Sequence, residues 1–159
     1  MILPSVFDSM EVLLKDKHIS EILKINEKFS EKGLNLTKGE ALEIIETRSR
    51  LIKNYERIVI DNEATKFLIE EFGNSSFITR ENYVSTINEL QEVFYYIKNE
   101  NGEKLSDNKL IIALKRIYED VCKGSLELLR GKGVEEFLKE FKTNSLKEEN
   151  LMTSGDLDD

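Results

Sequence analysis

The sequence predicts an all-α fold, a single-domain irregular bundle of five or six helices with one short extended segment near residues 57–60. Two long stretches, residues 37–55 and 79–99, indicate this fold, because each opens with a threonine that can cap a helix and continues with apolar side chains at helical spacing. The only proline is Pro4, so no proline forces a later helix to break. Apolar residues make up 40% of the 159 residues, which is enough to fill one core.

The N-terminal region divides into two predicted parts. Residues 1–17 are either an extended arm that docks by its large side chains or a short helix, since their apolar residues fit one helical face: Val6, Phe7, Met10, Leu13 and Leu14. Residues 20–30 predict a separate short amphipathic helix. Gly33, just beyond it, is placed to end that helix in the left-handed conformation.

Residues 37–55 predict the first long helix. Thr37 and Glu40 have the spacing of a capping box, in which each side chain accepts a hydrogen bond from the backbone N–H of the other residue. The residues expected on its buried side are Ala41, Leu42, Ile44, Ile45, Leu51, Ile52 and Tyr55. Residues 57–60, RIVI, look β-like, but one strand forms no sheet. We therefore expect an extended linker that buries Ile58 or Ile60.

Two further helices follow the linker. Asp61 is placed to cap a third helix over residues 62–72. After a Gly-Asn-Ser-Ser loop, Thr79 is placed to cap a helix over residues 80–99, which has the clearest apolar stripe in the chain. Its positions step by four, three, four and three residues, the spacing of helix-bundle packing: Tyr83, Ile87, Leu90, Phe94 and Ile97.

The last part of the bundle begins at Ser106 and Asp107. A helical face with Val121 on its buried side persists past Gly124, so we expect one long helix to about Leu129 with a weak point at Gly124. Gly131 and Gly133 are expected to end it. A final short helix is then predicted over residues 134–141.

The charge pattern separates a helical domain, residues 1–142, from an acidic, mobile tail, residues 143–159, which holds −4 of the net charge of −8. An acidic balance argues against nucleic acid as a partner, because phosphate binding needs Lys and Arg clusters. No apolar run is long enough to cross a membrane, and the N-terminus lacks a secretory leader. We therefore expect a cytoplasmic protein with no membrane partner.

Arg48 is the residue of greatest interest, because it falls on the otherwise apolar stripe of the first long helix. One interpretation is structural: the stem packs while the guanidinium reaches solvent or pairs with an acid on a facing helix. The other is functional, an arginine that binds an anion or docks a partner. Thermal melts of Arg48→Ala and Arg48→Met separate the two.

The remaining candidates are glutamates and tyrosines. Glu43 and Glu46 form one E-x-x-E pair and Glu89 and Glu92 another, but helical di-metal sites also need histidines on the same helices, and the only histidine is His18. We expect solvated glutamate faces and no metal, cofactor or catalytic residue.

Tyr95 and Tyr96 flank the apolar stripe on its two sides. Because adjacent helical residues cannot both point inward, at least one should lie near the surface, where tyrosine is favoured at binding interfaces.

Several strings within residues 20–130 resemble an uncharacterised family of small bacterial proteins, a domain of unknown function. The most distinctive are ETR at 46–48, ENY at 81–83, FYYIKNE at 94–100 and GSLELL at 124–129. The chain departs from the family pattern at Asp61-Asn62, where a glycine is common. The resemblance implies a helical, bacterial, cytoplasmic protein and supplies no activity, cofactor or site residue.

These observations favour a non-enzymatic interaction module, an adaptor or regulatory protein that presents a helical face to an unknown protein partner. A second hypothesis is a small-molecule-binding or enzymatic bundle in which Arg48 and the carboxylates of Glu46, Glu89 and Glu92 surround a polar cavity. A third is a homodimer that forms through an exposed apolar seam. The candidate binding or buried polar residues are Glu46, Arg48, Glu89, Glu92, Tyr95 and Tyr96.

Overall fold

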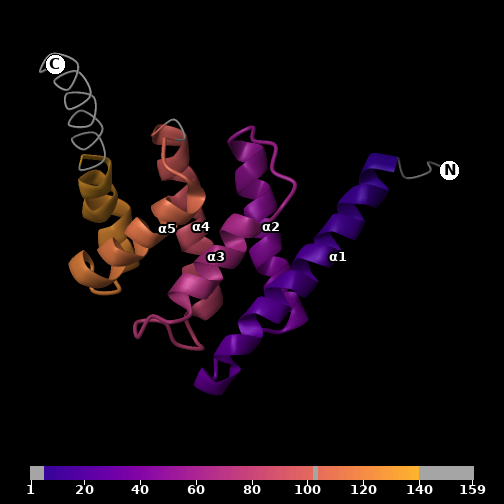
Figure 1. The fold of residues 1–159 in the computed structure, drawn as a ribbon, viewed down its shortest axis with the longest axis horizontal. Coiled ribbons are helices and arrows are strands. Elements are labelled where there is room, and N and C mark those ends of the chain that lie inside the picture. The colour runs from indigo at the N-terminus through magenta and orange to yellow at the C-terminus, as the bar shows by residue number, and fades with distance from the viewer. Residues whose placement is uncertain (1–5, 102–103, 140–159) are drawn as a thin grey trace, which may run out of the picture.

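The structure, a computed structural model, describes residues 6–101 and 104–139, and these contain helices, turns and loops but no β-strand (Figure 1). The all-α prediction is confirmed. The elements are α1 (Val6–Asn26), the 3-10 helix η1 (Glu27–Lys32), α2 (Lys38–Asn54), α3 (Glu63–Phe72), α4 (Tyr83–Glu100), α5 (Asp107–Arg116), the π-helix η2 (Ile117–Val121), α6 (Leu126–Leu128) and the π-helix η3 (Leu129–Gly133), followed by helical residues 134–139. The predicted tail at 143–159 lies outside the described residues.

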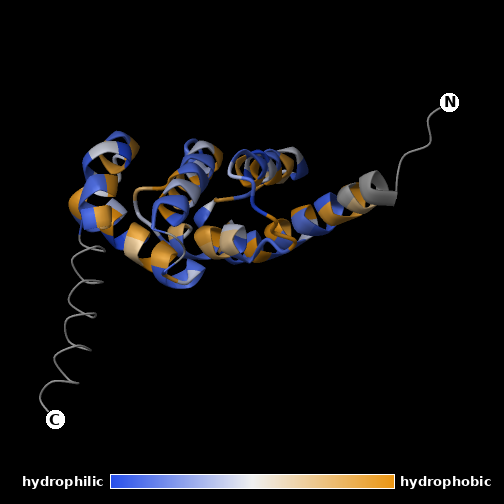
Figure 2. Cartoon of the chain, turned by 90° about the horizontal axis from the view of Figure 1, so that it is seen from above, coloured by the Kyte–Doolittle hydropathy of each residue, from blue (hydrophilic) through white to orange (hydrophobic). Residues whose placement is uncertain are grey.

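The N-terminal region is one helix rather than two parts. α1 runs unbroken for 21 residues, so the division into an arm or short helix and a separate helix at 20–30 is wrong. Its C-terminal half packs against α2 and α3, whereas its N-terminal half runs out beyond the other helices (Figures 1 and 2). Gly33 ends η1 with φ +81°, which confirms the predicted left-handed stop.

α2 lies between α1 and α4 and confirms the predicted first long helix. The Thr37 and Glu40 side chains accept the reciprocal hydrogen bonds of the capping box, at 3.1 and 3.0 Å. Tyr55 ends the helix. The apolar face packs into the core, with Leu42 and Tyr55 at its edge.

The linker after α2, residues 57–62, lies between α2 and α1 in both ribbon views (Figures 1 and 2). Its predicted orientation is wrong, because Ile58 and Ile60 are 94% and 70% exposed while Val59 packs on the core. In an extended segment successive side chains alternate sides, so a shift of one residue exchanges the buried and exposed sets. Hydrogen bonds to the linker backbone, described below, select the observed alternative.

α3 and α4 supply the centre of the bundle. The Asp61 carboxylate accepts the backbone N–H of Glu63 at 3.1 Å, but α3 begins one residue later than predicted, so its N-cap residue is Asn62 and not Asp61. α4 begins at Tyr83, three residues later than predicted, and its N-cap residue is Asn82 rather than Thr79. Thr79 and Asn82 instead accept each other's backbone N–H in the turn before the helix. The predicted α4 stripe is confirmed, since all five of its side chains are fully buried.

The helix after Ser106 does not continue to Leu129 as predicted. It passes from α5 into η2 and breaks at Lys123 and Gly124, which have φ of +51° and +80°. A Cβ at Gly124 would lie 2.4 Å from Cγ of Phe77, so the joint needs glycine for its conformation and for the close approach of that ring. Val121, the last residue of η2, is expected on the buried side and is instead 47% exposed.

The predicted stop at Gly131 and Gly133 is also wrong. Ser125 caps a new helix through the backbone N–H of Leu128, and the chain stays helical through η3 and on to residue 139. The π-turn absorbs both glycines, and Gly133 lies close to Cys122, where a Cβ would meet the sulfur at 3.0 Å. Residues 140 and 141 of the predicted last helix lie outside the described residues.

One core joins these helices, and it contains bonded polar groups. Leu90 and Leu114 are buried in it, and Leu42 packs against it. The Gln91 amide is fully buried: it accepts from the Thr65 hydroxyl at 2.8 Å and donates to the Ile44 carbonyl at 3.1 Å, which links α3, α4 and α2. Buried polar groups that are fully hydrogen-bonded fix the register of packed helices, because a shifted helix would leave a buried donor or acceptor without a partner and lower the stability.

Candidate functional site

A groove of about 570 Å³ lies between α1, α2 and the linker. On α2 it follows a face spaced at helical intervals, and α1 and the linker supply its other walls. The buried floor includes Ile45, Arg48 and Ile52, whereas Val12 and Ile60 stand exposed at its rim. The residues that line it are Val12, Leu14, Lys15, His18, Ile45, Arg48, Ser49, Ile52, Lys53, Arg57, Val59 and Ile60.

Arg48 binds the backbone of the linker. Its Nη2 donates to the carbonyl oxygen of Val59 at 3.1 Å and also to that of Asp61. Burial lowers the pKa of Arg48 from its ordinary value, while the nearby Tyr95 and Asp61 act in the opposite direction. The guanidinium therefore neither reaches bulk solvent nor pairs with a facing carboxylate, the two structural roles expected from sequence, and instead holds the linker against α2.

His18 holds the linker from the side of α1. Its Nε2 lies 3.1 Å from the carbonyl oxygen of Ile60, and since a carbonyl only accepts, this geometry assigns a proton to Nε2. Burial, followed by the positive charge of Arg48, lowers the pKa of His18 from its ordinary value. The neutral ring is therefore the favoured form in the folded protein.

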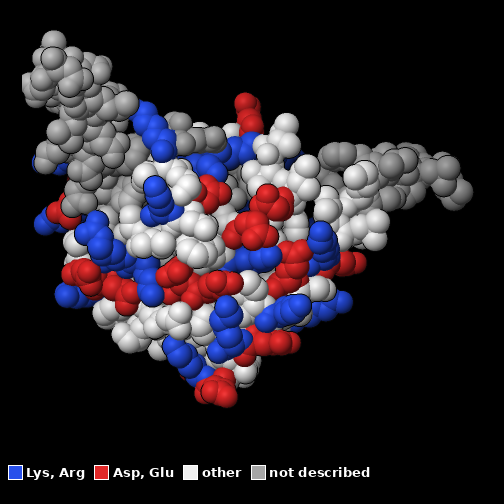
Figure 3. All heavy atoms as spheres, in the orientation of Figure 1, with Lys and Arg blue, Asp and Glu red and all other residues white. Residues whose placement is uncertain are grey.

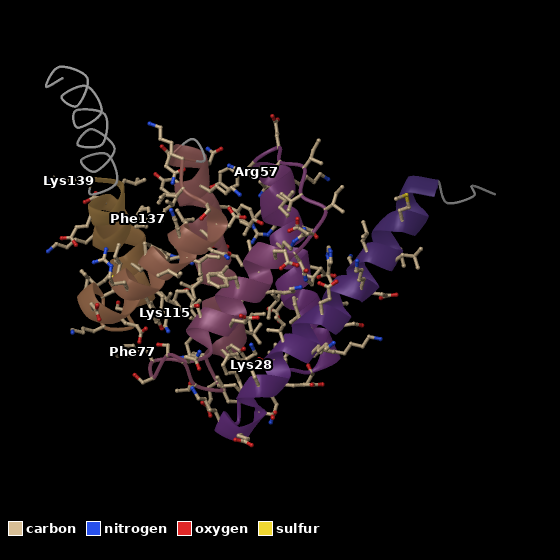
Figure 4. All side chains as sticks on the ribbon, in the orientation of Figure 1. Lys28, Arg57, Phe77, Lys115, Phe137 and Lys139 are labelled. Atoms are coloured by element: carbon tan, nitrogen blue, oxygen red, sulfur yellow. The ribbon has the colours of Figure 1, made fainter. Side chains whose placement is uncertain are left out.

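The lining of the groove is cationic. Lys15, Arg48, Lys53 and Arg57 contribute four positive charges, and no aspartate or glutamate is among the lining residues. Arg57 lies by the end of α2, at the opposite end of the bundle from Lys28 and Phe77 (Figure 4). A smaller hollow of about 240 Å³, which shares Leu14, His18 and Ile60 with the groove, differs because its lining also includes Glu21, Asp61 and Glu63.

The structure does not bring the predicted site residues together. Glu46 is exposed on α2, outside the groove lining. Glu89 and Glu92 lie on α4, where Arg130 contacts them at 3.0 and 3.2 Å and Arg50 contacts Glu92 at 3.2 Å. The convergence of all three glutamates on Arg48, which the small-molecule hypothesis requires, is absent from the described residues.

The two tyrosines differ in the way that their adjacency predicts. Tyr95 is buried and close enough to Arg48 for each to affect the other's pKa, and burial raises the pKa of Tyr95. Tyr96 is 43% exposed. Of the predicted set, Arg48 and Tyr95 therefore share one neighbourhood, with Tyr95 behind the groove rather than in its lining.

The groove lining holds few of the groups that take part in bond-making chemistry. Ser49 is the one hydroxyl in the lining, and no lining carboxylate is present to orient His18 as the acid of a catalytic triad does. Burial raises the pKa of the Cys122 thiol, which makes it a poorer nucleophile. Among the side chains that the structure describes, no three from His, Cys, Asp or Glu are placed to hold a metal ion.

Sequence reasoning missed most of the groove. Lys15, His18, Lys53 and Arg57 come from three segments, and no local motif marks them. A partial signal existed on α2, where Ile45, Arg48, Ser49, Ile52 and Lys53 share one broad helical face, with the two cations five residues apart at its opposite edges.

The surface elsewhere mixes both signs of charge. Lys and Arg alternate with Asp and Glu over the face shown in Figure 3. No helix of the described segments combines the length and apolar character that spanning a bilayer requires.

The chain belongs to the Family of unknown function (DUF6323), whose model matches residues 21–147. This match confirms the resemblance to a family of unknown function and includes Arg48, Lys53 and Arg57 but not Lys15 or His18. No functionally curated protein and no solved structure matches the chain.

Proposed function

We propose that this protein is a non-enzymatic interaction module that inserts the projecting half of α1 into an apolar groove on a protein partner. The observation that carries the proposal is the exposure of large apolar side chains in this N-terminal half of α1. Met10, Val12 and Leu13 are 55%, 61% and 70% exposed. Apolar clusters at the surface mark interaction sites more often than isolated apolar residues do.

The shape of α1 indicates the kind of partner. At about 100° per residue, Val12, Leu13 and Met10 spread over roughly 160° of the helix circumference. A single flat face or a narrow coiled-coil seam would leave part of this arc in water. A groove that surrounds the helix would bury all three side chains, as in other helix-in-groove complexes.

The energetics of α1 agree with such docking. A helical segment of about a dozen residues is marginally stable in water on its own. Here the projecting half continues a packed half, which supplies the nucleus, and burial of three apolar side chains by a partner adds stabilisation. The linker offers two more exposed apolar residues, Ile58 and Ile60, on the side of α1 that faces α2.

Capture from native extract tests this function. Immobilised wild-type protein is compared with the double variant Met10→Glu/Leu13→Glu and with Ile112→Glu, a matched control at an equally exposed apolar position on α5. We expect wild type and control to retain the same protein and the double variant to lose it. The proposal would be contradicted if wild type and both folded variants retained the same amount of that protein. It would also be contradicted if wild type retained no protein beyond what the bare matrix retains.

Light scattering distinguishes a foreign partner from a second copy. If purified wild type is a dimer and Met10→Glu/Leu13→Glu is a monomer, the same helix serves self-association. A monomer in both cases leaves the surface free for another protein.

A further inference from the structure

The groove between α1, α2 and the linker has a charge that the composition of the chain does not explain. The protein contains 31 acidic and 23 basic residues, yet the groove lining holds four of the basic residues and none of the acidic ones. Like charges around a partly buried cavity repel each other more strongly than they would in water. An anion in the groove would relieve that repulsion.

The Arg48 guanidinium is fixed in place for such an anion. Its bonds to the Val59 and Asp61 carbonyls hold it in the floor, so little side-chain freedom remains to be lost on binding. Lys53 and Lys15 stand nearer the opening, the first exposed and the second partly buried. Within the described part of the chain, neither lysine makes an ion pair with a carboxylate.

The rest of the lining is aliphatic. Six of the twelve lining residues are apolar, and none is aromatic: Val12, Leu14, Ile45, Ile52, Val59 and Ile60. The volume of about 570 Å³ falls within the range typical of small-molecule sites, roughly 300–1,000 Å³. A ligand that satisfies both halves of the lining needs an aliphatic body and a compact anionic head.

We propose that the groove binds a small amphipathic anion, a single aliphatic chain of medium length that ends in a carboxylate or phosphate group. The head lies among the basic side chains of Lys15, Arg48, Lys53 and Arg57, and the chain lies along the aliphatic lining. Carboxylate and phosphate share the oxygen geometry that guanidinium groups bind. This site goes beyond the proposed function and does not depend on it. Val12 belongs to both surfaces, but Met10 and Leu13, the two residues that the capture test changes, are outside the groove lining.

Calorimetric titration of the purified chain with defined probes tests the site. Decanoate and decyl phosphate, each kept below its micelle concentration, are expected to bind saturably with one molecule per chain, and the tighter of the two identifies the preferred head group. Acetate and inorganic phosphate have the head without the chain, and decyltrimethylammonium has the chain without the anion. We expect no saturable binding of these three.

Two charge reversals locate the site. Lys53→Glu removes a cation from the groove and is expected to weaken decanoate binding at least tenfold. Lys28→Glu changes the net charge equally but lies in η1, outside the groove lining, so it should leave the affinity unchanged. Thermal melts of both variants verify that they are folded.

Three results would overturn the proposal: no saturable binding of either amphiphilic anion, equal binding of decyltrimethylammonium, or equal weakening by Lys53→Glu and Lys28→Glu. The second would show a nonspecific apolar surface, and the third a general charge effect. None of them bears on the docking of α1, since these measurements contain no protein partner.

Discussion

Two arginines of α2 that stand two residues apart, Arg48 and Arg50, belong to opposite kinds of charge cluster. Arg50 points to the surface, where Glu92 lies 3.2 Å away, and Arg130 joins the cluster through Glu92 and Glu89. Arg48 points into the groove, where it bonds backbone carbonyls and shares the lining with three other cations. The first cluster contains its own counterions, whereas no carboxylate lines the second.

The comparison shows that the surroundings of an arginine decide its role, not its residue type or its helix. Ion pairs that remain in water contribute little, because hydration and side-chain entropy offset most of the Coulomb attraction. A buried guanidinium must replace the lost water with protein acceptors, here the linker carbonyls. It therefore determines the position of the linker and leaves a positive field in the groove.

The largest expected effect comes from removal of the buried arginine. Arg48→Ala removes hydrogen bonds to two carbonyls and the packing of a long stem, so the free energy of unfolding should fall by about 2–4 kcal/mol. Arg48→Met, which keeps most of the stem volume, should recover part of this loss. Chemical denaturation at neutral pH measures both values.

Arg50→Ala is the matched control on the same helix, and its cost should stay below about 1 kcal/mol. If Arg48→Ala proves no more destabilising than Arg50→Ala, the linker does not depend on the buried guanidinium, and the contrast between the clusters fails.

A smaller effect is expected from the protonation of His18. Its folded pKa is lowered from 6.5, so below that pH the unfolded chain binds more protons than the folded one. Stability from the neutral ring is complete above the unfolded pKa and is lost as the pH falls below it. Burial, Arg48 and Lys17 oppose the added proton more strongly than Glu21 and the Ile60 carbonyl favour it, so protonation of His18 lowers the stability of the fold.

His18→Gln checks this prediction, because glutamine can donate to the Ile60 carbonyl without taking up a proton. Stability measured between about pH 7.5 and 5.5 should decline more steeply for wild type than for the variant. Parallel pH profiles would show that His18 does not contribute to the decline.

The smallest effect is expected in the surface cluster. Arg130→Ala breaks contacts with Glu89 and Glu92, both of them partly exposed, so the cost should be about 0.2–1 kcal/mol at low salt. Because salt screens exposed pairs, the difference from wild type should shrink in concentrated NaCl. A loss as large as that of Arg48→Ala would show that the two clusters do not differ in kind.

The sequence predicted the parts of the fold that local periodicity determines. The α4 stripe from Tyr83 to Ile97 and the Thr37–Glu40 cap were predictable because helical spacing and capping chemistry lie within a few residues. The break at Gly124 was not, since the apolar pattern continues across it and the deciding contact is with Phe77, far back in the chain.

The site was less predictable than the fold. Arg48 was identified because a charged residue interrupted an apolar stripe, but its partners are linker carbonyls, which leave no trace in the sequence. The extended linker can turn either of two sets of side chains toward the core, Val59 or its neighbours Ile58 and Ile60. Only tertiary contacts determine which set is buried. Lys15, His18 and Lys53 meet only when α1 packs on α2.

The most direct test of the contrast between the cationic groove and the Arg130 cluster is a backbone amide shift map during titration with decanoate. We expect the largest shifts at Ser49, Lys53, Val59 and Ile60, around the groove, and almost none at the amides of Glu89, Glu92 and Arg130. Shifts that are largest at the Arg130 cluster, or equal over the whole surface, would contradict this expectation.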